Sequence, residues 1–320
     1  MNDIFDTQLG FTLGRQNLIF GDGFAILDGT PLDGSRSIYF DAARIDYELK
    51  PDSRLTAFYL TLNEQDENLP VVNDRDNSLL EQPEQGAGLY FTSKYRKTDL
   101  QGYYILKTVE ASTAFPVESN IHTIGGRLVQ PLSADWSITG EGGLQMGSRG
   151  DADRLAYAGF AWLDYHARII SQNSCSFKFG AFAYSGDDPG TGDKFEGWDP
   201  LFARWPLWSE SYIYTQVNEG RVAEWTNIYA PFVRSRFNLN PNVTLLFDVY
   251  QLMAFQSMPV AGGLWGEGKN RGNLISGWLK FTVTENLAGH LLWERFFPGD
   301  FYFDGADDYS WMRFELLLKL

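Results

Sequence analysis

The chain of 320 residues contains one cysteine, three histidines and no long apolar run. The single cysteine, Cys175, excludes an internal disulfide bond and a cysteine-based zinc site. No segment approaches the roughly 18 apolar residues that a membrane-spanning helix requires, and the mean hydropathy is -0.27. A transmembrane β-barrel is compatible with this value, because its strands turn alternate residues toward a polar lumen.

Basic residues are also scarce. The chain has 26 Lys and Arg against 41 Asp and Glu, a net charge of -15. A nucleic-acid partner is excluded, because such a partner would need a basic stripe. Much of the acid lies in predicted loops, for example in residues 64–84, where Arg75 is the only basic residue.

Aromatic residues make up 16% of the chain, which also has 32 glycines, and apolar residues alternate with polar ones. This alternation predicts about fourteen strands separated by turn residues. The predicted strands are 8–18, 37–49, 53–63, 86–94, 98–108, 120–130, 135–146, 153–167, 174–184, 223–238, 243–255, 271–283, 286–296 and 309–320. No helix with convincing caps and no linker interrupts them. We therefore expect one all-β domain over residues 1–320.

The connections between these strands alternate between short and long. The short ones are 50–52, 95–97, 131–134, 169–173, 240–242 and 284–285, and the long ones are 19–36, 64–85, 109–119, 147–152, 185–222, 256–270 and 297–308. Outer-membrane barrels have short periplasmic turns and long external loops. A soluble β-sandwich has no reason to sort its loops in this way. The pattern predicts a transmembrane antiparallel up-and-down β-barrel in a bacterial outer membrane.

Apolar residues form one face of the predicted strands. In the last strand Met312, Phe314, Leu316, Leu318 and Leu320 alternate with Arg313, Glu315 and Lys319. Aromatic residues at strand ends, such as Tyr47, Trp136, Tyr165, Trp225 and Trp293, are typical of interfacial girdles and favour lipid contact. Two positions fit poorly. Arg15 falls on the apolar face unless Gly14 marks a bulge, and Pro231 lies inside a strand.

Short blocks of sequence occur along nearly the whole chain. They are Gly14-Arg15-Gln16, Phe20-Gly21-Asp22-Gly23, Phe40-Asp41-Ala42-Ala43-Arg44, Ser185-Gly186-Asp187-Asp188, Asp199-Pro200-Leu201-Phe202, Asn227-Ile228-Tyr229-Ala230-Pro231 and Glu294-Arg295-Phe296-Phe297-Pro298-Gly299-Asp300-Phe301. In this order they resemble the alginate export family of outer-membrane β-barrels. The resemblance implies a barrel of about eighteen strands that secretes an anionic polysaccharide through a basic lumen.

Members of that family carry about four further strands before the Gly14-Arg15-Gln16 block. The first residues here, Met1 to Asp6, also lack the basic and apolar regions of a signal peptide. We therefore expect an N-terminally truncated member of the family. In a chain of fourteen strands, the first and last strands should pair, because unpaired backbone groups in hydrocarbon are costly.

Strand alternation places Arg154 and eight further basic residues in the lumen, and these eight are the candidate pore-lining and substrate-binding residues. They are Arg44, Lys107, Arg127, Lys178, Arg234, Arg236, Lys280 and Arg313. Basic residues along a narrow water path would lower the barrier for an anionic or sugar-like solute. Alternatively, they pair with lumen carboxylates on neighbouring strands and simply neutralise a polar interior. Arg234 and Arg236, two residues apart on one face, are the predicted unpaired basic spot.

The long connection 185–222 is predicted to be an extracellular or constriction loop. Its segment 195–214 is rich in aromatic residues, which could enter the lumen, stack on sugar rings or pack on one another. Its acidic start, 185–196, offers oxygen ligands for calcium but lacks a calcium-loop spacing, so a solvated turn is the alternative. A soluble or surface-attached carbohydrate-binding protein, with 195–214 as its platform, is the alternative to a pore.

No catalytic arrangement is evident. His122, His166 and His290 are scattered, and the sequence contains neither a nucleophile elbow nor a phosphate loop. We therefore expect no enzyme, no cofactor and no bound metal. The expected function is an outer-membrane pore that passes solutes by diffusion, with export of an anionic polysaccharide such as alginate as a narrower possibility. Its partners would be outer-membrane lipid and the solute. No feature of the sequence indicates an oligomeric state.

Overall fold

The structure is a computed structural model that describes residues 8–27, 39–63, 82–113, 115–170, 173–203, 208–212, 215, 219, 225–259 and 263–319. Its strands are β1 (Leu9–Gln16), β2 (Phe40–Lys50), β3 (Ser53–Leu62), β4 (Glu84–Tyr95), β5 (Thr98–Val109), β6 (Ser119–Pro131), β7 (Trp136–Arg149), β8 (Ala152–Ile170), β9 (Asn173–Tyr184), β10 (Lys194–Phe195), β11 (Ile228–Asn240), β12 (Val243–Met253), β13 (Asn270–Thr284), β14 (Leu287–Pro298) and β15 (Tyr309–Leu318). No helix in the described part of the chain is both long and apolar enough to cross a membrane.

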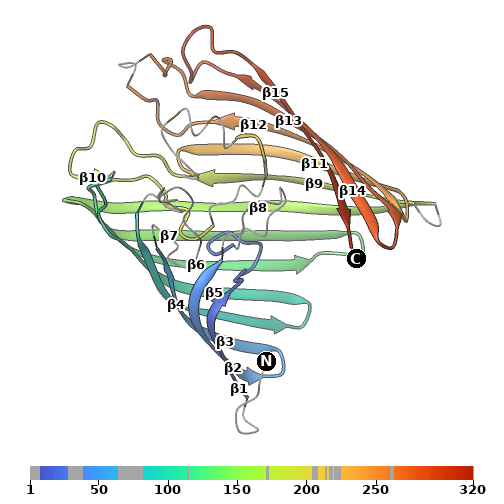
Figure 1. The fold of residues 1–320 in the computed structure, drawn as a ribbon, viewed down its shortest axis with the longest axis horizontal. Coiled ribbons are helices and arrows are strands. Elements are labelled where there is room, and N and C mark those ends of the chain that lie inside the picture. The colour runs from blue at the N-terminus through green and yellow to red at the C-terminus, as the bar shows by residue number, and fades with distance from the viewer. Residues whose placement is uncertain are drawn as a thin grey trace, which may run out of the picture.

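Fourteen of these strands form one antiparallel meander, in which each strand pairs with its neighbours in sequence (Figure 1). The two-residue strand β10 lies off this path and pairs in parallel with β8. All fourteen predicted strands are present, which confirms the up-and-down all-β architecture. The largest difference in their bounds concerns the predicted strand 223–238, which begins only at Ile228.

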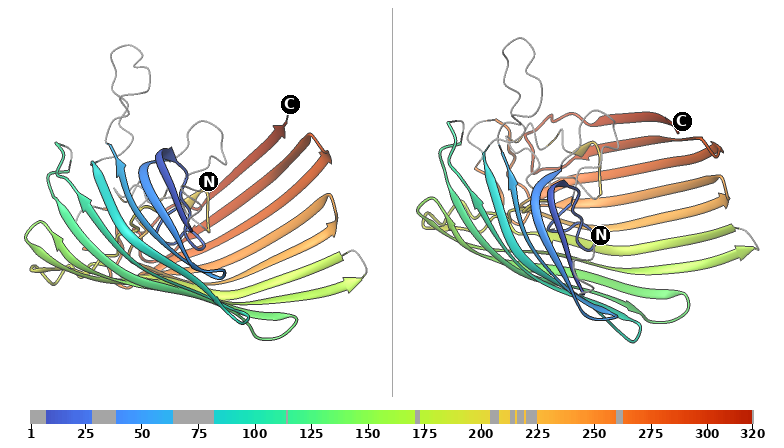
Figure 2. Two further views of the ribbon diagram at one scale, coloured as in Figure 1. Left: turned by 90° about the horizontal axis from the view of Figure 1, so that it is seen from below. Right: turned by 60° about the horizontal axis from the view of Figure 1, so that its bottom comes forward.

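The register divides the sheet into two faces. Residues that pair directly across neighbouring strands share a face, as do Ile105, Thr123 and Gln145 in β5, β6 and β7. We call the face of these three residues the inner face and the opposite one the outer face. Figure 2 shows the sheet as a curved trough.

The outer face exposes large apolar side chains on strand after strand. Among them are Leu13, Ile45, Tyr59, Leu89, Tyr104, Ile124, Leu144, Leu155, Phe179, Val233, Phe247, Met312, Phe314 and Leu316. The predicted apolar face of the last strand is thus present in β15. Trp136 and Tyr165 lie opposite each other on this face, with ring centroids 4.6 Å apart. Trp225 was also expected in the aromatic girdle. It is instead buried, because it lies before the start of β11, in the connection that folds over the inner face of the sheet.

Arg15 lies on the outer face, as its parity predicts. No bulge at Gly14 resets the register, since β1 pairs with β2 without a shift from Leu9 to Gln16. The guanidinium is instead neutralised in place by Asp41, with an N–O distance of 3.0 Å, and it lies 3.9 Å from the ring centroid of Tyr39. Arg15 is near the end of β1, where a charge on the outer face costs less than at mid-strand.

The meander places alternate connections on opposite rims of the sheet. Residues 17–39, 63–83, 110–118, 185–227, 254–269 and 299–308 connect strands at one rim, which we call the long-loop rim. The turns at the other rim are all short, which confirms the predicted sorting of the loops. One prediction is wrong: the connection 147–152 is a two-residue turn, Gly150–Asp151, because β7 and β8 extend further than expected.

The sheet is open in the described part of the chain. The strand order begins at β1 and ends at β15, and these two edges are not hydrogen-bonded to each other (Figure 2). The prediction that the first and last strands pair is therefore wrong. The curvature accumulated over fourteen strands makes a trough and does not bring its edges together.

Candidate functional site

Two segments from the long-loop rim fold into the trough and cover its inner face. The first inner segment is residues 17–27, and the second consists of the described residues of the connection 185–227, namely 185–203, 208–212, 215, 219 and 225–227. They contact each other through two backbone hydrogen bonds, from Leu27 N–H to Phe202 O (3.2 Å) and from Phe202 N–H to Ala25 O (3.0 Å). Aromatic stacking holds the first segment to the sheet, with 4.3 Å between the ring centroids of Phe20 and Tyr90.

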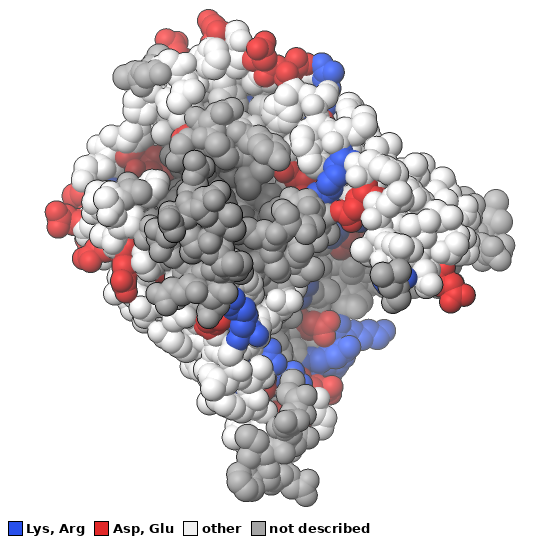
Figure 3. Space-filling model, in the orientation of Figure 1, with Lys and Arg blue, Asp and Glu red and all other residues white. Residues whose placement is uncertain are grey.

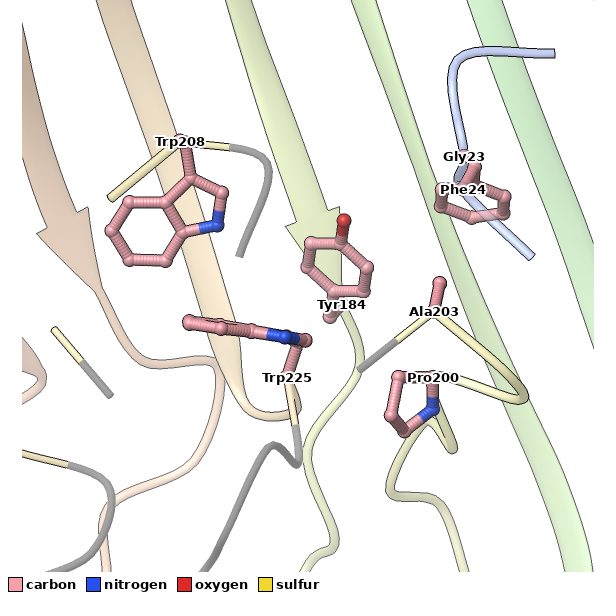
Figure 4. A pocket seen from close by; sticks show the side chains of 7 residues that line it. All are labelled: Gly23, Phe24, Tyr184, Pro200, Ala203, Trp208 and Trp225. Carbon is pink, nitrogen blue, oxygen red and sulfur yellow. The ribbon is translucent and has the colours of Figure 1, made fainter. Parts of the chain in front are cut away.

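A small pocket remains where the two inner segments meet β9. Phe24, Trp208, Trp225 and Tyr184 surround it together with Gly23, Pro200 and Ala203 (Figure 4). Its volume of about 10 Å³ is enough for about one water molecule. The aromatic residues therefore fill the inside of the trough here and leave no room for a solute.

Polar residues of the inner face hold the second inner segment in place. The Nζ atom of Lys107 lies 2.9 Å from Asp199 and 3.1 Å from Glu84, and its side chain is only 2% exposed. Gln145 exchanges two hydrogen bonds with the backbone of Asp199, at 2.8 and 2.9 Å. Arg154 donates to the carbonyl oxygen of Gly197 at 2.8 Å. Because these donors and acceptors are buried, each contact costs free energy to break.

A second group of contacts lies on β13, β14 and β15. Arg271 forms a buried ion pair with Glu219 at 2.5 Å and donates to the hydroxyl of Tyr212 at 2.8 Å. The carboxylate of Glu294 accepts hydrogen bonds from Ser209 and Ser211, both at 2.8 Å. Arg313 pairs with Glu210 at 3.1 Å. The second inner segment is thus attached to strands on both halves of the sheet.

All eight basic residues predicted for the lumen lie on the inner face. Each is assigned to this face by the register, because residues directly opposite each other on neighbouring strands share a face. Examples are Lys178 opposite Arg234, and Arg234 opposite Asp248. The structure therefore brings these side chains to one surface. Their roles as pore-lining or substrate-binding residues remain predictions.

Six of the eight cations have a carboxylate partner. The pairs are Arg44 with Asp46, Lys107 with Glu84 and Asp199, Arg127 with Asp22 and Glu141, Lys178 with Asp164, Arg234 with Asp248, and Arg313 with Glu210. For these six residues the structure agrees with the alternative in which lumen cations pair with carboxylates, and it does not show a free basic patch. Three of the carboxylates, those of Asp22, Asp199 and Glu210, come from the inner segments.

The predicted unpaired spot at Arg234 and Arg236 needs correction. Arg234 lies 3.4 Å from Asp248 and donates to the hydroxyl of Tyr250 at 2.6 Å, because Asp248 is directly opposite it on β12. Arg236 donates to the side chain of Asn238, and no carboxylate in the described part of the chain pairs with it.

Lys280 is the second inner-face cation of this kind. Its Nζ atom lies 4.6 Å from the ring centroid of Trp278, and no described carboxylate lies within ion-pair distance. Thr244 is opposite Lys280, and Leu246, two residues further along β12, is opposite Arg236. Arg236 on β11 and Lys280 on β13 are separated by β12. They are the two of the eight predicted cations that pair with no described carboxylate.

The aromatic part of the second inner segment is buried. Trp198, Phe202, Trp208 and Tyr212 are at most 7% exposed, whereas Trp205 and Tyr214 lie outside the described residues. The described aromatic residues both enter the trough and pack on one another, for example Trp208 on Tyr212 with 5.0 Å between ring centroids, so two of the three readings fit the structure. A carbohydrate-stacking platform at 195–214 is wrong for the four described aromatic residues, because their rings face the inner face of the sheet.

The acidic start of the second inner segment uses its carboxylates within the loop. Asp187 accepts a hydrogen bond from Glu196 N–H at 3.0 Å, and Asp188 accepts one from Gly190 N–H at 2.8 Å. Burial raises the pKa of the Asp187 carboxyl above its ordinary value. Among the described residues, no group of three or more His, Cys, Asp or Glu side chains is arranged to hold a metal ion.

Sequence reasoning missed Arg271, although it is as buried as Lys107. Strict alternation from the rest of β13 puts residue 271 on the outer face. A register shift beside Gly272, whose φ is 126°, turns Arg271 inward. The glycine is the only local signal, and it does not identify the partner, Glu219, which lies 52 residues earlier.

Charge is distributed unevenly over the molecule. Figure 3 shows acidic side chains along much of the upper and left margins, whereas Lys and Arg lie beside Asp and Glu in the hollow. In the connection 299–308 alone, the sequence has Asp300, Asp304, Asp307 and Asp308. The acidic excess is thus concentrated at the rim, and the inner face is close to balanced.

No protein-family model matches the sequence, and no curated protein matches it. Solved structures do match the fold. Pseudomonas aeruginosa OpdQ aligns with a TM-score of 0.57 and 12% identity over 97% of this chain and 78% of its own. A BenF-like porin from Pseudomonas fluorescens Pf-5 gives 0.55 and 12%, over 98% and 75%. Pseudomonas aeruginosa OccK2 (OpdF), solved in complex with glucuronate, gives 0.54 and 12%, over 98% and 79%.

At 11–12% identity these likenesses concern the fold alone. They agree with the all-β up-and-down architecture of this chain. The predicted alginate export family and the predicted N-terminal truncation receive no support from them. The open meander of this chain resembles the β-barrel fold of outer-membrane porins, which is the fold that its sequence predicts.

Proposed function

We propose that the chain forms an outer-membrane channel that passes small anionic solutes by diffusion, with the two inner segments narrowing the path. The observation that carries the proposal is the position of the predicted basic residues: all eight lie on the inner face of a porin-type sheet whose outer face is apolar. Cations beside a water path lower the barrier for an anion. The glucuronate complex of OccK2 is consistent with a carboxylated sugar as one such solute.

Arg236 and Lys280 would contribute most to anion selectivity. Their charge is not cancelled by a described carboxylate, whereas the other six cations are neutralised by their partners. The inner segments restrict the path to small solutes, because aromatic residues fill the trough where the segments meet. Export of a polysaccharide such as alginate remains a prediction of the resemblance alone.

Planar-bilayer recording tests the proposal. The double substitution Arg236→Gln and Lys280→Gln should lower the anion-over-cation permeability ratio while leaving channels open. The loss should be largest at low salt, because at 0.1–0.15 M the screening length is about 8–10 Å. The control is Lys50→Gln with Lys97→Gln, which removes the same charge from exposed positions at the short turns. An unchanged ratio would contradict anion selectivity, and absence of channels from the unsubstituted chain would contradict the pore.

A further inference from the structure

A larger cavity, of about 380 Å³, lies at the long-loop rim, away from the small pocket between the inner segments. Its lining comes from the second inner segment, from the connections 254–269 and 299–308, and from the ends of β14 and β15. The lining residues are Thr215, Glu219, Leu264, Trp265, Phe296, Pro298, Tyr302, Phe303, Ala306, Asp307 and Tyr309. We call this cavity the aromatic pocket. Its volume lies within the range of small-molecule sites.

Five of the lining side chains are aromatic, and they come from the connections 254–269 and 299–308 and from the ends of β14 and β15. The ring centroids of Phe296 and Tyr309 are 5.5 Å apart, and Tyr302 meets Phe296 edge-on at 6.1 Å. Trp265 lies 6.4 Å from Tyr302 with nearly parallel rings. Phe303 is 44% exposed, so the pocket opens to solvent beside it. The ligand would therefore be surrounded by ring faces and edges.

The charged groups of the pocket are acidic. Glu219 is bound to Arg271 and accepts a hydrogen bond from Tyr302 at 2.8 Å, so its charge is balanced. Asp307 is exposed and forms no ion pair with any described residue, unlike its neighbour Asp308, which pairs with Arg295. None of the described residues that line the pocket is Lys, Arg or His. Among these lining residues an anionic ligand would find no cation.

We infer that the aromatic pocket binds a small organic cation of the alkylammonium class. Aromatic rings attract a cation through the negative potential of their faces, and clusters of rings are a known way to hold quaternary ammonium groups. Asp307 supplies the opposite charge at the entrance, and the acidic connection 299–308 raises the local concentration of cations. None of the eight basic residues of the inner face lines this site, so the inference does not depend on the proposed anion selectivity.

Calorimetric titration of the folded, detergent-solubilised chain tests the inference with choline as the cation. The neutral isostere 3,3-dimethylbutan-1-ol and the anion benzoate serve as comparison probes. Choline should bind at least fivefold more tightly than the alcohol, which lacks only the charge, and benzoate should bind more weakly still. The choline affinity should fall as salt is added, because Asp307 is exposed.

Three variants locate the site. Phe303→Ala and Asp307→Asn should each weaken choline binding several-fold, and both side chains are exposed, so neither change should unfold the protein. Asp304→Asn removes a charge from the same connection without touching the pocket lining and should have little effect. Equal binding of choline and the alcohol, or equal affinities of Asp307→Asn and Asp304→Asn, would overturn the inference, as would an absence of choline binding.

Discussion

Lys107 is a buried ammonium group between two carboxylates. It lies on β5 and connects Glu84 on β4 to Asp199 in the second inner segment. Removing one partner of a buried ion pair leaves an uncompensated charge, which costs about 3–5 kcal/mol. We therefore expect Lys107→Met to lower the free energy of unfolding by roughly that amount. Urea unfolding in lipid vesicles, followed by tryptophan fluorescence, measures it.

Lys280→Met provides the matched control. Lys280 is also a lysine on the inner face, but it has no carboxylate partner among the described residues, and it is partly exposed. Its replacement should cost about 1 kcal/mol or less, as is usual for surface positions. Equal losses in the two variants would mean that the contacts with Glu84 and Asp199 contribute no more than the lysine stem does.

Some pairings of single residues could have been predicted from the sequence. Arg127 and Glu141 are fourteen positions apart around a short turn, as are Asp164 and Lys178, and Arg234 and Asp248. The structure pairs each of these directly across a hairpin. A short turn fixes the register of its hairpin, so opposite charges equally far from the turn must meet. Applied to Arg234, this rule would have excluded it as an unpaired cation.

At the scale of elements, the second inner segment is attached to the sheet partly through the carboxyl of Asp199. Burial raises the pKa of this carboxyl. The charges of Lys107 and Arg154 and two hydrogen bonds lower it by more, so the net pKa is below its ordinary value. A carboxyl with a lowered pKa stabilises the folded state above its unfolded pKa of about 3.9. This stability is lost as the pH falls through the lower, folded pKa.

We therefore expect the second inner segment to stay attached between pH 7 and pH 5 and to loosen first below about pH 4. Hydrogen exchange of the amides of residues 198–203, corrected for the intrinsic rate at each pH, measures the attachment. Asp199→Asn should weaken the protection at pH 7 and remove this part of its acid dependence. Loss of protection already at pH 6 would show that a different group controls the segment.

At the scale of the whole molecule, the two faces of the sheet meet different surroundings. Phe247 and Leu246 are adjacent at the middle of β12 but lie on the outer and the inner face, respectively. An arginine facing lipid near the bilayer midplane costs about 2–4 kcal/mol. We expect Phe247→Arg to destabilise the protein by this amount in lipid vesicles, and Leu246→Arg by about 1 kcal/mol or less.

Urea unfolding in vesicles measures both variants. Similar values would contradict a lipid-facing outer surface, since in water an exposed arginine costs little on either face.

The open edges of β1 and β15 are a second property of the whole molecule. Each unsatisfied backbone group in hydrocarbon costs several kcal/mol, so in a bilayer both edges require a backbone partner.

The sequence by itself determined the strands, the sorting of the loops and the two faces. These features follow from local rules: alternation with period two assigns a face, and turn residues end a strand. Fourteen strands, the apolar face of β15 and the common face of the eight basic residues were therefore predictable. The same rules failed at Arg271, where a bulge beside Gly272 reverses the face.

Only the tertiary structure decided which charges are neutralised and what fills the trough. Lys107 meets Asp199, Arg127 meets Asp22, and Arg271 meets Glu219, over separations of 92, 105 and 52 residues. Such contacts depend on how connections from the long-loop rim fold back over the sheet, and no periodicity of the strands encodes that path. Closure of the sheet is likewise set by curvature summed over all strands, which is why the pairing of β1 with β15 was predicted wrongly.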